Sequence, residues 1–139
     1  MTACVPVLLS RPSQKAPALA IFLGLVLIFT TAAAVATEYS HYGNPVIPVR
    51  VGQTTVKAEV VASPERLYLG LSHRAGLAEG QGMLFLMPSL EIQQFCMRGM
   101  RFSLDILWIV QGRVVGIAAE IPPQESRSLA SPQPVNLVL

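Results

Sequence analysis

The residue of this sequence that most clearly demands a chemical partner is Asp105. It stands in residues 104–110 (LDILWIV), which are otherwise entirely apolar. A carboxylate buried without a partner is very costly, so in a buried strand Asp105 must be paired or protonated. The cations that we expect to pair with it are Arg98, Arg101 and Arg74.

Two interpretations of this charged group stay open, and the second makes its four residues candidates for a binding site. In the first, which the sequence favours, Asp105 and an arginine form an ion pair that organises the fold. In the second, the group forms a pocket that binds a carboxylate or a sugar hydroxyl, with an arginine as a two-pronged donor.

Sulfur indicates a second chemistry. Cys96, Met97, Met100 and Met83, together with Met87, offer the soft thiolate and thioether ligands that Cu(I) prefers. Methionines also fill gaps in ordinary β-rich cores, and Cys96 and Met97 should point to opposite faces of a strand. Copper binding is therefore a minor hypothesis, and we expect no cofactor.

The enzymatic alternative is a hydrolase-like protein centred on Asp105 and His73. A catalytic triad requires a nucleophile, a histidine and an acid that converge. The sequence has no G-x-S-x-G or comparable nucleophile motif, and His41 and His73 do not have the spacing of a zinc site. We therefore expect a protein that is not an enzyme.

The elements that must position these residues are mainly strands. Ser63-Pro64-Glu65-Arg66 is typical of a helix start, and Gly70 and Gly76 limit that helix to two or three turns. Gln111-Gly112 fits a tight hairpin. The candidate strands are residues 46–51, 56–60, 83–87, 92–97, 104–110, 113–121 and 135–139. We predict a mainly β domain with one short helix (α+β), built as a small barrel-like or curled sheet.

Three details of these strands can be checked. The alternation of apolar and charged residues from Val56 to Val60 predicts that Lys57 and Glu59 share a solvent-exposed face. Pro48 predicts an edge position for its strand, and Pro88 is expected to end the strand before it.

The first 36 residues are typical of a targeting signal. Arg11 and Lys15 precede an apolar core at residues 18–29, and small residues lead to Ala36, where we expect cleavage of a signal peptide. Residues 16–37 are uncharged and long enough to be an uncleaved membrane anchor instead. Both alternatives export the remainder, to the periplasm, to the outside of the cell, or to the outer face of the cytoplasmic membrane.

The charge of the exported part argues against a nucleic-acid partner. The net charge is +2, and without Arg11 and Lys15 the 10 basic side chains fall to match the eight acidic ones. A neutral domain has no electrostatic attraction for DNA or RNA. We expect residues 37–45 to be a polar linker and residues 46–139 to be a single β-rich domain.

Six blocks resemble, in order and spacing, the family called domain of unknown function 192. They are Ser63-Pro64-Glu65-Arg66, Gly70-Leu71 with Arg74, Gly82-Met83-Leu84-Phe85, Phe95-x-Met97-Arg98, Leu104-Asp105-Ile106 and Ser131-Pro132-x-Pro134-Val135. The resemblance covers residues 46–139. It implies a compact, barrel-like, mainly β domain with one short helix in a secreted or membrane-tethered prokaryotic protein, and it implies no activity.

The sequence also departs from that family. Members tend to have tryptophan at the position of Cys96 and an asparagine-threonine pair at Gly99-Met100. They often continue past the position of Leu139 with a short helix and a closing strand. We therefore expect either a truncated frame or a barrel with an open edge, which is a risk for aggregation.

The function that we expect is a small binding or accessory module of the cell envelope, with Arg98 and Asp105 at its polar centre. Its partner would be a small molecule or an envelope protein. The cell membrane would be a further partner if residues 16–37 are retained.

Overall fold

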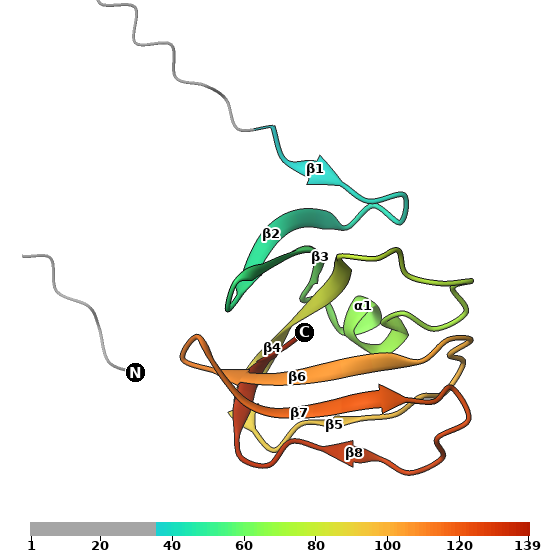
Figure 1. The fold of residues 1–139 in the computed structure, drawn as a ribbon, viewed down its shortest axis with the longest axis vertical. Helices are drawn as coiled ribbons and strands as arrows, with labels where there is room; N and C mark the ends of the chain where they lie inside the picture. The colour runs from blue at the N-terminus through green and yellow to red at the C-terminus, as the bar shows by residue number, and fades with distance from the viewer. Residues whose placement is uncertain (1–35) are drawn as a thin grey trace, which may run out of the picture. The chain divides into compact units, whose positions relative to one another are not determined.

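Seven strands form one curled sheet in the computed structural model, which describes residues 36–139 (Figure 1). The order across the sheet is β1-β2-β3-β4-β9-β6-β7, and β5 and β8 form a separate two-stranded ribbon. The strands are β1 (Glu38–Tyr39), β2 (Pro45–Val51), β3 (Thr54–Val61), β4 (Gln81–Glu91), β5 (Gln94–Phe95), β6 (Leu104–Val110), β7 (Arg113–Ile121), β8 (Leu129–Ala130) and β9 (Val135–Val138). The predicted fold class, mainly β with one short helix, is confirmed.

The predicted hairpin is present with the predicted bounds. β6 and β7 pair antiparallel up to Val110 and Arg113, so the turn consists of Gln111 and Gly112 alone. Both residues have left-handed backbones, with φ of 50° and 71°. Two left-handed residues make the turn whose twist matches that of the strands, which explains why a two-residue connection suffices.

The single helix, α1 (Pro64–Leu69), is shorter than the two or three turns that we expected. It begins as predicted, because the side chain of Ser63 accepts a hydrogen bond from the backbone N–H of Arg66. It ends at Gly70, whose φ of 51° leaves the helical region. Gly70 also lies against the Phe85 ring, where an added Cβ would approach to 3.3 Å. The helix forms part of the crossover between the parallel strands β3 and β4.

The prediction that Pro88 ends a strand is wrong. β4 continues through it to Glu91, and its pairing with β9 shifts register between Leu86 and Glu91. In such an irregularity the missing N–H of a proline removes no regular ladder hydrogen bond. The strand expected over residues 92–97 shrinks to β5, and the loop before β9 contains β8.

β9 lies inside the sheet, between β4 and β6. Val135 and Val138 are the most deeply buried residues of β9. The core around them includes Trp108, Ile106, Ile121 and Met97. A second cluster, of Val61, Leu71 and Met83, lies under α1. The outermost strands of the sheet are β1 and β7, so the sheet is curled and open rather than a closed barrel.

Residues 37–45 are more than the polar linker that we expected. Glu38 and Tyr39 form β1, which pairs with the start of β2, and Asn44 is buried. The predicted signal peptide or anchor lies almost wholly outside the described residues. Within residues 36–139, no helix is long and apolar enough to cross a membrane.

Candidate functional site

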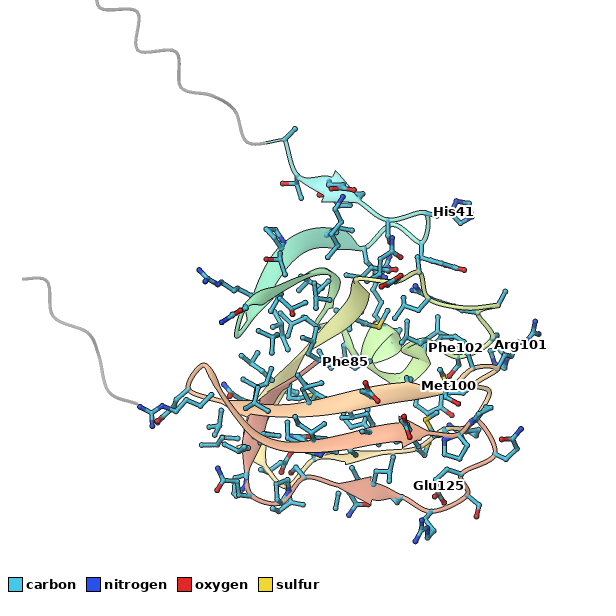
Figure 2. The ribbon with its side chains drawn as sticks, viewed as in Figure 1. His41, Phe85, Met100, Arg101, Phe102 and Glu125 are labelled. Atoms are coloured by element: carbon cyan, nitrogen blue, oxygen red, sulfur yellow. The ribbon has the colours of Figure 1, made fainter. Side chains whose placement is uncertain are left out.

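A cavity of about 660 Å³ lies between α1 and the strands β4 and β6. Its lining is mostly apolar and comes from segments that are distant in the sequence. Phe85, Met100 and Phe102 belong to this lining, and in Figure 2 they lie around α1. Other apolar lining residues are Leu67, Leu71 and Leu77.

Two charged side chains, Arg98 and Asp105, are part of the cavity lining. Both are among the four charged candidates named from the sequence. The structure gives them different roles. Arg98 is exposed, its Nη2 donates to the hydroxyl of Tyr68, and its guanidinium lies over the Tyr68 ring, with Cζ 5.1 Å from the centroid. The carbonyl of Arg98 accepts a hydrogen bond from Ser72 Oγ at 3.0 Å. These contacts link α1, through Tyr68, and the segment after it, through Ser72, to the segment that carries Arg98.

The expected ion pair between Asp105 and an arginine is wrong. Among residues 36–139 the ion pairs are Lys57–Glu38, Arg74–Glu59 and Arg127–Glu125. Asp105 is exposed, and its Oδ1 accepts a hydrogen bond of 2.7 Å from the backbone N–H of Glu120.

A bulge explains why an aspartate stands in this apolar strand. Leu104 pairs with Ile121 and Ile106 with Ala118, so one residue of β6 faces two of β7. Glu120 has a φ of 53° and its N–H points away from the regular ladder. The Asp105 carboxylate accepts from that N–H, which the ladder leaves without a partner.

Arg74 lies in a buried network away from this cavity. Its Nη1 and Nη2 donate to the carboxylate of Glu59 at 2.5 and 3.0 Å. Ser40 and Asn44 donate to the same carboxylate at 2.9 and 2.6 Å, and the Tyr42 ring lies 3.7 Å from Arg74 Cζ. The prediction that Glu59 is exposed is therefore wrong, because a buried arginine holds it inside.

The network also changes the pKa of Glu59. Burial alone would raise this pKa, but the hydrogen bonds from Arg74, Asn44 and Ser40 and the charge of Arg74 outweigh burial, so the pKa lies below its ordinary value. Arg66 extends the network, since its Nη1 donates to the side chain of Asn44 and to the carbonyl of Tyr42.

The remaining candidates take separate positions. Arg101 is exposed, lies outside the cavity lining and extends from the surface in Figure 2. His73 is exposed, with a φ of 65°, and its N–H donates to the carbonyl of Gly99 at 2.8 Å. Within the part of the chain that the structure describes, no hydrogen bond joins His73 to Asp105, and the only hydrogen bond of the Asp105 side chain is the one to Glu120.

All five sulfur residues singled out from the sequence line the same cavity. Cys96 is exposed, whereas Met83 and Met97 are each only 3% exposed. Met100 packs against both core clusters. No group of three or more histidine, cysteine or acidic side chains within residues 36–139 could hold a metal ion. A metal here would therefore depend on methionine sulfur.

Sequence reasoning missed the cavity itself and the tyrosine at its rim. Tyr68 is 75% exposed and lines the cavity. The sequence did contain a signal for the cavity. Gly70 and Gly76 limit the length of α1, and a short helix covers only part of the sheet.

Comparison with known proteins gives a family and a fold. The family model DUF192, described as "Uncharacterized ACR", matches residues 47–139. A protein of unknown function from Novosphingobium aromaticivorans is 27% identical, with a TM-score of 0.69 over 76% of this chain and 79% of that one. A putative transcription regulator from Sinorhizobium meliloti, 23% identical, shares the fold with a TM-score of 0.59 over 72% of each chain. The comparison with curated proteins found no match.

Proposed function

Because the chain belongs to the DUF192 family, whose description names no activity, we propose a function from the cavity: the protein is a small binding module of the cell envelope that takes up a largely apolar small molecule. The observation that carries this proposal is the cavity of about 660 Å³ between α1, β4 and β6. Ligand pockets of proteins commonly have volumes of roughly 300–1,000 Å³.

The character of the lining supports this use. Protein interiors are normally close-packed, and empty apolar space lowers stability. A domain of this size therefore gains stability if an apolar molecule fills the space. The polar side chains at the cavity are few, which is the usual composition of a small-molecule site.

The envelope location rests on the sequence. We propose that the N-terminal segment exports the domain, either as a signal peptide cleaved after Ala36 or as an anchor formed by residues 16–37. The equal numbers of basic and acidic side chains after Lys15 agree with a partner that is not a nucleic acid.

A neutral apolar dye, N-phenyl-1-naphthylamine, tests the cavity directly. The domain is expected to bind one dye molecule with a large increase in fluorescence. Met100→Trp replaces a thioether side chain of the lining with a bulkier indole ring, which should fill part of the cavity and weaken dye binding by at least about tenfold. Leu90→Trp, on an exposed residue outside the cavity lining, is the control and should leave binding unchanged.

The outcomes separate clearly. If the unaltered domain binds no dye, or if Met100→Trp binds as well as Leu90→Trp, the cavity is not the site. Thermal unfolding shows whether Met100→Trp is folded. If it is not, Leu77→Trp makes the same test from another wall of the cavity.

One observation favours a second candidate, a site for Cu(I). Cys96, Met83, Met87, Met97 and Met100 all line the cavity, and thiolate and thioether sulfur are soft ligands. Anaerobic titration with Cu(I) in competition with bicinchoninate tests it. Binding that Met83→Leu and Cys96→Ser both weaken would support this candidate, and equal binding by these variants would exclude it.

A further inference from the structure

We infer that the molecule bound in this cavity carries an anionic group, which Arg98 binds at the edge of the cavity. The inference rests on the proposed function and adds the chemical class of the ligand: an apolar body with a carboxylate or a similar acid. Its basis is an arginine that the fold leaves without an acidic partner, within the described residues, at a mostly apolar site.

The two charged side chains at the cavity do not form an ion pair with each other. Arg98 and Asp105 are the two charged side chains that line it. None of the ion pairs within residues 36–139 involves either residue. Within residues 36–139, Asp105 Oδ1 accepts one hydrogen bond, from the N–H of Glu120, and the guanidinium of Arg98 donates one, to the hydroxyl of Tyr68. The positive charge of Arg98 therefore has no acidic partner among the described residues and is available to an anionic ligand.

The guanidinium of Arg98 retains donors for an anion. It has five N–H groups, and its one described hydrogen bond comes from Nη2. The remaining N–H groups can bind a carboxylate with two parallel hydrogen bonds, an arrangement that specifies acids over alcohols.

The surroundings of Arg98 limit its freedom to move away. The Tyr68 ring lies under the guanidinium, and Ser72 holds the backbone carbonyl of Arg98. His73 holds the next residue, since its N–H donates to the carbonyl of Gly99. Gly99 itself has a φ of 75°, and a Cβ there would lie 3.0 Å from the His73 ring. Two hydrogen bonds, from Ser72 Oγ to the carbonyl of Arg98 and from the N–H of His73 to the carbonyl of Gly99, therefore hold the backbone at Arg98 against the segment after α1.

The expected effect is moderate because Arg98 is exposed. Water and salt screen a charge at the surface, so the preference for an acid should fall as ionic strength rises. A charged hydrogen bond of this kind corresponds to a preference of about tenfold.

Dodecanoate and dodecanol, which differ only in the head group, provide the test. Each is titrated against N-phenyl-1-naphthylamine bound to the domain, below the concentration at which it aggregates. Dodecanoate is expected to displace the dye at about tenfold lower concentration than dodecanol. Arg98→Gln should remove this difference and leave dodecanol unchanged. Arg101→Gln, which alters an exposed arginine outside the cavity lining, is the matched control and should preserve it.

The alternative results have different meanings. If both compounds displace the dye equally, or if Arg101→Gln removes the preference as fully as Arg98→Gln, the anionic class is overturned and apolar binding stands. If the domain binds neither the dye nor either compound, the proposed function fails as well.

Discussion

Asp105 shows that a carboxylate in an apolar strand can accept a hydrogen bond from a backbone N–H of the neighbouring strand. The bulge in β7 leaves the N–H of Glu120 outside the ladder, and Asp105 Oδ1 accepts it at 2.7 Å. The sequence predicted a buried carboxylate with an arginine partner, but Asp105 is exposed and its partner is a backbone N–H. The sequence could not indicate this partner, because the bulge depends on the pairing of β6 with β7.

Substitutions at Asp105 should show whether its contribution to stability comes from the hydrogen bond that it accepts or from its negative charge. Asp105→Ala removes the acceptor and should lower the free energy of unfolding by about 1 kcal/mol. Asp105→Asn keeps an oxygen in place and should stay within about 0.5 kcal/mol of the original protein. Urea unfolding measures both. Equal losses in the two variants would mean that the negative charge, and not the hydrogen bond, is what matters.

Glu59 should make the stability depend on pH in the acid range. Its pKa in the folded protein lies below the ordinary value of 4.5. A lowered pKa contributes stability that is present above the pKa of the unfolded chain. This contribution is lost as the pH falls from that value through the folded-state pKa.

Comparison of the original protein with Glu59→Gln over this range is the measurement. At neutral pH the variant should be less stable, because it leaves Arg74 buried without a charged partner. The difference in unfolding free energy should shrink as the pH falls below 4.5. A difference that stays constant with pH would show that Glu59 is not the titrating group.

At the scale of the elements, the sequence predicted correctly those features that depend only on neighbouring residues. The turn Gln111-Gly112 and the start of α1 at Ser63 depend on neighbouring residues, and both were predicted correctly. β4 passes Pro88 because β9 pairs with it irregularly, and no local pattern carries that information. The burial of Glu59 was missed for a similar reason. Its partner Arg74 comes after α1 in the sequence, 15 residues away, so no local pattern shows that the two residues meet.

The left-handed turn at Gln111 offers a stabilising substitution. Gln111 has a φ of 50°, a region that asparagine tolerates better than most residues. Gln111→Asn should therefore raise the unfolding free energy by about 0.5 kcal/mol. Thermal or urea unfolding measures the change.

The turn between β2 and β3 supplies a matched control. It also has two residues, Gly52 and Gln53, but only Gly52 has a positive φ. Gln53→Asn makes the same chemical change without a left-handed backbone and should give no such gain. Equal gains at both turns would show that backbone conformation is not the cause.

At the scale of the whole molecule, the structure separates the four charged candidates that the sequence grouped together. Arg98 and Asp105 do line one cavity, but Arg74 belongs to another network and Arg101 lies on the surface. The cavity exists because α1 lies beside β4 and β6, which are separated in the sequence by β5. An arrangement of this kind follows from tertiary packing, which residue spacing does not encode.

Integrity of the whole sheet should depend on β9. Val138 pairs with Phe85 of β4 and Trp108 of β6 and is only 1% exposed. Val138→Asp buries a charge between the two and should cost more than about 4 kcal/mol, enough to unfold a small domain. Asn136→Asp introduces the same side chain at an exposed position of the strand. Circular dichroism should find this control folded, and an unfolded control would contradict the explanation.

The position of β9 also sets an order of events. β4 and β6 are joined through this strand, which comes after all the others in the chain. While the chain is being synthesised, the strands before β5 and the hairpin after it therefore have no ladder between them until residues 135–138 emerge. Completion of the sheet is delayed until β9 has been synthesised. Until then the two parts of the sheet remain unlocked from one another.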